Sequence, residues 1–261
     1  MTLPAPDIVQ EARRIIAAAA NRAITLRLLG GLAVRLHSPS AGHRSLSRTY
    51  ADIDFATPRS HSRRVEQLFA DLGYTADRAF NTLNGAERMI FYDRANGRRI
   101  DVFVGGFAMC HRLPIAERMA VDPLTLPLAE LFLTKLQIVE LNDKDVRDLY
   151  ALLLDHPVGS SDDETTNARR IARLCARDWG LYKTVSLNIE RLRQLVPAYQ
   201  FAPAEHALLL ERLDALRAAI EHEPKSMRWR LRARLGPRVR WYELPEDIER
   251  RDPATDGAEQ F

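Results

Sequence analysis

Three aspartates have the spacing expected of a metal site. Asp52 and Asp54 lie two residues apart in the stretch YADIDFAT, where apolar residues separate and follow them. If this stretch is a β-strand, both carboxylates leave the same face of the sheet. Two like charges this close repel each other unless a cation lies between them. Asp52 and Asp54 are therefore candidate ligands for a divalent cation.

A third aspartate, Asp101, stands in a second apolar stretch, RRIDVFV. Strand alternation places it on one face with Arg99 and Phe103, and a solvated face is the simple alternative. If the two strands are neighbours, three carboxylates converge. Hard oxygen ligands suit Mg²⁺, with Mn²⁺ as an alternative. A pair of such ions, about 3.5–4 Å apart, is a known arrangement for phosphoryl chemistry.

A glycine pair, Gly30-Gly31, precedes these strands, between the apolar stretch AITLRLL and the short helical pattern LAVRLH. Glycine lets the backbone approach a ligand closely, and the free amides at a helix start attract anions. A phosphate held at the pair would lie above the carboxylates. A plain turn is the alternative interpretation.

The N-terminal half must supply the elements that position these residues. Hydrophobic periodicity predicts a mixed sheet with flanking helices there. Asn96-Gly97 predicts a tight hairpin turn. We expect helices over 7–22 and 62–72, strands over 23–29, 51–56, 74–79, 88–93 and 98–104, and further pairing within 107–113.

From Pro127 onward the pattern is helical. The fold class expected is α+β, a small mixed sheet with flanking helices followed by an all-α C-terminal region. We expect an α/β core over 1–125, a helical domain over 126–222 and a basic, aromatic segment over 223–261. The expected helices cover 128–141, 143–154, 164–179, 181–196 and 204–222, with a linker over 156–163.

Composition limits the class of protein. The 261 residues are 46% hydrophobic with a net charge of +3, which is ordinary for a globular chain. Cys110 and Cys175 match no metal spacing and indicate a reducing compartment. The first residues lack a signal-peptide pattern, and no apolar run is long enough to span a bilayer. We therefore expect a cytoplasmic protein without a membrane partner.

The stretch 225–240 carries seven cations and no acid, and Trp229, Trp241 and Tyr242 lie in or directly after it. Arginine with aromatic residues can hold RNA through phosphate contacts and stacking. The alternation of arginines from Arg228 to Arg234 favours another interpretation, a strand with one packed face whose arginines pair with the acidic body. Both interpretations stay open.

Two further groups have open roles. Lys135 lies at the edge of an apolar helix face, where a surface lysine is the simple interpretation. Asp145 and Asp148 are expected as first-turn acids and intrahelical partners, for example Lys144 with Asp148. The loop before Asp52 contains His37, His43, Arg44 and Arg48, which either offer cations to phosphate or are solvated.

Four segments together carry a family resemblance. The chain resembles the nucleotidyltransferase superfamily with the DNA-polymerase-β-like fold. The last segment is similar to the helical part of abortive-infection toxin nucleotidyltransferases, a group that includes type IV toxin–antitoxin toxins. The resemblance covers about residues 8–155. The segments are LLGGLAVRL (28–36), ADIDFA (51–56), RRIDVFV (98–104) and LPLAELFLTKLQIVELNDKDVRDLYALL (126–153).

The resemblance implies an enzyme that moves a nucleoside monophosphate from an NTP to an acceptor hydroxyl and releases pyrophosphate. Asp52 and Asp54 would bind the metal ions. Asp101 would be the third carboxylate and a base for the acceptor hydroxyl. The acceptor would be RNA, a protein or a small molecule, and the basic C-terminal stretch favours nucleic acid.

The resemblance also assigns the nucleotide contacts. Gly30 and Gly31 would cradle the phosphates, and Lys135 would reach the triphosphate. The family usually has Ser or Thr after the glycine pair, where this chain has Leu32. The alternative function is therefore a catalytically weak protein of the same fold that binds a nucleotide or an antitoxin partner.

Overall fold

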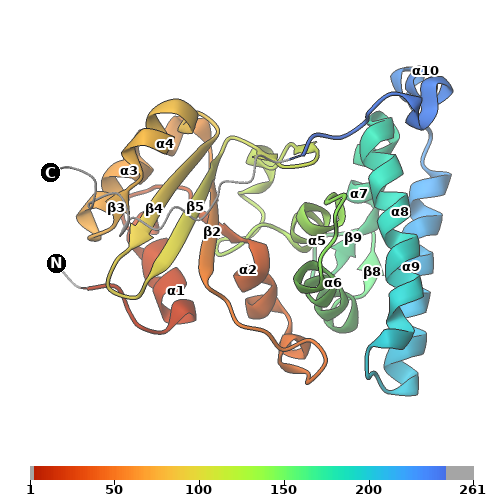
Figure 1. Cartoon of the computed structure of the whole chain (residues 1–261), viewed down its shortest axis with the longest axis horizontal. Helices are drawn as coiled ribbons and strands as arrows, with labels where there is room; N and C mark the ends of the chain where they lie inside the picture. The colour runs from red at the N-terminus through yellow and green to blue at the C-terminus, as the bar shows by residue number, and fades with distance from the viewer. Residues whose placement is uncertain (1–2, 245–261) are drawn as a thin grey trace, which may run out of the picture.

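A computed structural model describes residues 3–244 of the chain. Its centre is a mixed five-stranded sheet in the order β1-β2-β5-β4-β3, in which β2 and β5 are parallel and the other pairs antiparallel. The expected α+β class with a small mixed sheet is confirmed (Figure 1). The strands are β1 Arg27–Leu29, β2 Asp52–Thr57, β3 Thr75–Ala76, β4 Arg88–Asp93 and β5 Arg98–Val104.

Helix α3 packs an aromatic core against one face of this sheet. Phe69 of α3 stacks on Phe91 of β4 with ring centroids 4.4 Å apart, and it also contacts Phe55 of β2. Since neighbouring strand residues alternate, the residues on either side of Phe55 face the opposite side. The aspartates of β2 therefore lie on the face away from α3. The helices of this half are α1 Ile8–Ala20, α2 Gly30–His37, α3 Ser62–Asp71 and α4 Arg78–Asn84.

The remaining helices form a second layer beside the sheet, and α2 lies between the two groups (Figure 1). A short parallel pair, β8 Val158–Gly159 with β9 Thr166–Asn167, interrupts the helices. The expected all-α C-terminal region and its 156–163 linker are corrected to this extent, and the domain boundaries stay predictions. The helices are α5 Leu128–Leu136, α6 Asp143–Asp155, α7 Ala168–Arg177, α8 Trp179–Leu195, α9 Pro203–His222 and α10 Met227–Leu235.

Several predicted elements are shorter in the structure, and the helix expected over 164–179 begins only at Ala168, after β9. The strand expected over 23–29 begins only at Arg27, because Ala23 adopts a positive φ of 51° in the turn after α1. The strand expected over 74–79 has two residues, and Asp77 then caps α4 by accepting a hydrogen bond from the amide of Phe80. The helix expected over 128–141 ends at Leu136.

The basic stretch forms helix α10 and not the strand that the arginine alternation favoured. Ser226 caps the helix by accepting a hydrogen bond from the amide of Trp229. No residue of α10 is buried. The hydrophobic residues Met227, Leu231 and Leu235 recur every four residues, which is helical spacing. Residues 245–261 of the expected C-terminal segment lie outside the described part.

A short hairpin follows β5 and connects the sheet to the helical layer. Its strands are β6 Phe107–Ala108 and β7 Arg112–Leu113, so further pairing within 107–113 is confirmed. The amide of Glu243, after α10, donates a hydrogen bond to the carbonyl of Cys110 in this hairpin, at 3.0 Å. The chain after α10 thus returns to the sheet. Among the helices of residues 3–244, none has the length and apolar character needed to cross a bilayer.

Candidate active site

The parallel pairing of β2 and β5 brings the three predicted aspartates to one face of the sheet. Asp54 lies directly opposite Asp101, and Asp52 lies opposite Arg99. All three aspartates line one cavity of about 300 Å³, which Gly30 also lines. The convergence expected from two separate strands is therefore present in the structure.

Asp54, unlike Asp101 opposite it, has no direct partner within residues 3–244. Among the described residues, none forms a hydrogen bond or ion pair with its carboxylate. Burial raises the pKa of Asp54 to about 7, with further contributions from the nearby charges of Asp101 and Asp52. The positive charges of Lys135 and Arg88 lower the pKa, but they do not outweigh burial and the neighbouring aspartates.

Gly30 makes room for Asp54. Its φ of +70° is a conformation that residues with a side chain rarely adopt, and a Cβ at this position would overlap with Oδ2 of Asp54. Gly30 is also the first residue of α2, so the free amides of that helix start lie beside the cavity. Gly30 thus allows the start of α2 to lie directly beside the carboxylate of Asp54.

Asp101 is neutralised by two arginines. Its Oδ1 accepts hydrogen bonds from Nε of Arg88 at 2.8 Å and from Nη2 of Arg99 at 3.0 Å. Nε of Arg99 lies 2.9 Å from Oδ2. These contacts explain how a carboxylate that is only 4% exposed is tolerated in an apolar strand. Asp101 is thus less available to a cation than Asp54.

Lys135 lies in the cavity and is not a surface lysine. Its Nζ is 2.9 Å from Oδ1 of Asp145 and 3.2 Å from Oδ2 of Asp148. Burial alone would lower the pKa of Lys135, but the two aspartates outweigh burial and raise it. The intrahelical pair expected between Lys144 and Asp148 is wrong, because Asp148 points towards Lys135.

Arg48 occupies the space beside Gly31. Its Nε and Nη2 bind the two oxygens of Asp148 at 2.9 and 2.8 Å. A Cβ on Gly31 would overlap with this guanidinium, and Gly31 does not line the cavity. Of the two predicted phosphate-binding glycines, the structure places only Gly30 at the cavity. Of the two interpretations of the loop cations, neither describes Arg48, which is largely buried in an ion pair.

Two of the three carboxylates, those of Asp52 and Asp54, have the donor chemistry that would suit a divalent cation. Within residues 3–244, no group of three His, Cys, Asp or Glu side chains is arranged to hold a metal ion. Asp52 and Asp54 have no protein partner there, and the raised pKa of Asp54 marks a charge that a cation would offset. Asp52 and Asp54 are therefore the residues that fit Mg²⁺, while Asp101 is held by its arginines.

Sequence reasoning gave no site role to Arg88 and Arg99, which both line this cavity. The signal for Arg99 was present, because strand alternation places it on the face of Asp101. Arg88 required the hairpin register, which sets it opposite Phe103. The sequence left the roles of Asp145 and Arg48 open, and their partners Lys135 and Asp148 depend on how α6 packs against its neighbours.

No model of a known protein family matches this chain, and no curated protein matches it. The resemblance to nucleotidyltransferases therefore rests on the residues themselves. It enters the functional assignment as a proposal.

Proposed function

We propose that the chain is a metal-dependent nucleotidyltransferase with the DNA-polymerase-β-like fold. One observation carries the proposal. Asp54 lies opposite Asp101 across parallel strands, with Asp52 on the same face, in a cavity beside the glycine-started helix α2. A carboxylate without a partner and with a pKa of about 7 is costly to keep, and a cation-binding role accounts for it.

The reaction proposed is transfer of a nucleoside monophosphate from an NTP. An acceptor hydroxyl oxygen forms a bond with the α-phosphorus, and the bond from that phosphorus to the bridging oxygen of the β-phosphate breaks. Pyrophosphate leaves, and the hydroxyl proton passes to a carboxylate of the site. Mg²⁺ bound at Asp52 and Asp54 supplies charge neutralisation for the phosphates.

The chain's own residues contribute alignment and charge. The free amides at the start of α2 attract a phosphate to the mouth of the cavity. Arg88 and Arg99 are positive groups beside the carboxylates, held in place by Asp101. Phosphoryl transfer depends mainly on such positioning and electrostatic stabilisation.

A second candidate is a protein of the same fold that binds a nucleotide, or an antitoxin protein, and turns over weakly. Three contacts favour it. Asp101 is tied to two arginines, Lys135 is tied to Asp145 and Asp148, and Arg48 fills the space beside Gly31. The side chains that would contact a phosphate are thus already bound to other groups of the protein.

Transfer of an α-phosphate label tests the first candidate. The protein is incubated with Mg²⁺ and each NTP labelled with ³²P at the α- or the γ-phosphate, together with total RNA, protein or small-molecule pools. Nucleotidyl transfer puts the α-label, and not the γ-label, into one pool. Asp54→Asn should abolish this incorporation.

Asp163→Asn is the matched control, since Asp163 is exposed and lies outside the cavity. It should transfer label as the wild type does. Nucleotide binding without transfer to any pool would favour the second candidate. Transfer that survives Asp54→Asn would refute the assignment of the site.

A further inference from the structure

Two more cavities continue from the carboxylate cavity in a row. The first, of about 640 Å³, shares Arg88, Phe103 and Met109 with the carboxylate cavity. The second, of about 750 Å³, shares Glu87, Ala108 and Arg112 with the first. We call these two cavities the track. It begins beside the carboxylate cavity, passes the β6–β7 hairpin and ends between α8 and α10.

The track is more positive than the chain as a whole. Seven arginines and three acids line it, an excess of four positive charges, whereas the entire chain has a net charge of +3. The acids are Glu87, Asp178 and Glu243. The arginines are Arg59, Arg88, Arg112, Arg177, Arg228, Arg232 and Arg240.

Aromatic side chains line the same two cavities as these cations. Phe80 and Phe103 line the first cavity, and all three tryptophans of the chain line the second. The guanidinium of Arg232 lies over the ring of Trp179, 4.6 Å from its centroid. Nε1 of Trp241 donates a hydrogen bond to Oγ1 of Thr184 at 3.1 Å. Trp179 is thus held by α10 and Trp241 by α8.

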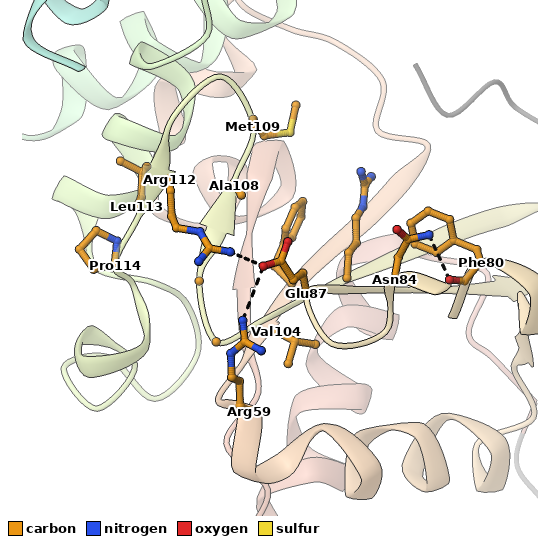
Figure 2. Close-up of a pocket in the computed structure, with 14 residues that line it drawn as sticks. Arg59, Phe80, Asn84, Glu87, Val104, Ala108, Met109, Arg112, Leu113 and Pro114 are labelled. Atoms are coloured by element: carbon orange, nitrogen blue, oxygen red, sulfur yellow. Dashed lines mark hydrogen bonds and ion pairs between the residues drawn. The ribbon is translucent and has the colours of Figure 1, made fainter. Parts of the chain in front are cut away.

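Glu87 closes the junction between the two cavities. It forms ion pairs with Arg59, at 3.7 Å, and with Arg112 (Figure 2). The three side chains are each more than half exposed, at 57%, 58% and 64% for Arg59, Glu87 and Arg112. Exposed pairs of this kind contribute little to stability, so a phosphate can replace Glu87 at both arginines.

We infer that the track binds a single-stranded nucleic acid, with one end directed towards Asp54. Arginines that follow a backbone, together with aromatic faces for bases, are the features of single-strand binding. A small molecule would need only one such cavity. The inference rests on the proposed function in one respect, namely that the bound end supplies the acceptor hydroxyl.

Fluorescence anisotropy with 12-nucleotide single-stranded RNA and DNA probes tests the binding. The wild type and Asp163→Asn should bind alike, because Asp163 is exposed and lines neither the track nor the carboxylate cavity. The double variant Arg177→Gln/Arg228→Gln should bind at least about tenfold more weakly at about 150 mM salt. The slope of the logarithm of its binding constant against the logarithm of the salt concentration should become shallower by about 1.4, because two phosphate contacts are lost.

The matched control is Arg169→Gln/Arg191→Gln. Both arginines are exposed, Arg169 lies on α7 as Arg177 does, and neither lines the track. This control changes the net charge equally and should alter affinity less than about twofold. Equal losses in the two double variants would overturn the inference, as would a wild type that binds neither probe.

Intrinsic fluorescence separates nucleic acid from an acidic protein. Because all three tryptophans line the second cavity, stacked bases should quench their emission. Polyglutamate of equal charge should not quench this emission. Equal binding of polyglutamate, without quenching by RNA or DNA, would overturn the nucleic-acid assignment in favour of an acidic protein partner.

The outcomes separate this inference from the proposed function. If α-label transfer fails but the oligonucleotides bind and the track variant does not, the track stands and the enzyme assignment falls. If transfer occurs to an acceptor while the track variant binds and reacts as the wild type does, the track assignment falls and the enzyme stands. The RNA and DNA probes show which sugar the track accepts.

Discussion

Asp54 faces Asp101 in register across the parallel strands β2 and β5, and only one of the two has a protein partner. Asp101 accepts hydrogen bonds from Arg88 and Arg99. Asp54 has none among the described residues. The same strand pair thus holds one neutralised and one unneutralised carboxylate side by side, and this asymmetry defines where a cation would bind.

The unneutralised carboxylate should lower stability at neutral pH. The pKa of Asp54 rises from 3.8 in the unfolded chain to about 7 in the fold, so the folded state holds the proton more tightly. Stability from this group is present at low pH and is lost as the pH rises from about 4 to about 7. Each pKa unit corresponds to about 1.4 kcal/mol.

Asp54→Asn removes this ionisation. The variant should have a higher free energy of unfolding than the wild type, and this gain should be about 3 kcal/mol larger at pH 8 than at pH 5. Urea denaturation at both pH values measures the difference. A gain of the same size at both pH values would show that Asp54 does not titrate in this range. Asp163→Asn should show no pH-dependent gain.

Gly30→Ala should destabilise the fold and displace Asp54. The substitution combines a strained φ of +70° with an overlap against Oδ2 of Asp54. Gly97→Ala is the control, since Gly97 also has a positive φ, of 63°, but a Cβ there would meet nothing within 4 Å. We expect losses of about 3 kcal/mol for Gly30→Ala and about 1 kcal/mol for Gly97→Ala. Equal losses in denaturant unfolding would contradict a close contact between Gly30 and Asp54.

Lys135→Met should leave Asp145 and Asp148 without their shared cation. Asp148 keeps its ion pair with Arg48, but Asp145 loses its cation, and leaving one buried charge uncompensated costs about 3 kcal/mol. Lys144→Met, on an exposed position of α6, should cost less than about 0.5 kcal/mol. Thermal or urea unfolding compares the two variants. A Lys135→Met protein as stable as Lys144→Met would mean that Lys135 is not an internal ion-pair partner.

Arg99→Gln should strengthen divalent cation binding while weakening the fold. The variant removes one positive charge beside Asp101 and Asp52, and an interaction of about 1 kcal/mol corresponds to about fivefold in affinity. Arg94→Gln removes an exposed arginine near the hairpin turn and should change affinity little. Mn²⁺ titration of both variants measures the effect. Weaker binding by Arg99→Gln would indicate that Arg99 supports the cation site instead of opposing it.

The sequence predicts strands and helices well where the periodicity is long. The hairpin of β4 and β5 with its Asn96-Gly97 turn is confirmed, and so is the helix expected over 143–154, which is α6 Asp143–Asp155. Helix α4 was missed because its segment contains two asparagines and a threonine, which are weak helix formers. Its cap, Asp77, was the signal that could have indicated it.

The basic stretch shows why alternation can mislead. Arginines at every second position resemble a strand, but the spacing of Met227, Leu231 and Leu235 is that of a helix. The partners of Lys135 could not be read from α5 or α6 alone, because they depend on how the two helices pack. The sequence located the aspartates, whereas only the fold shows which of them is already neutralised.

Direct titration with Mn²⁺, followed by electron paramagnetic resonance, tests the central claim that Asp52 and Asp54 hold a divalent cation. The wild type and Asp163→Asn should bind the ion with the same affinity, and an NTP should strengthen the binding. Asp52→Asn and Asp54→Asn should each weaken the binding at least about tenfold. Equal Mn²⁺ affinity in all four proteins would contradict the account.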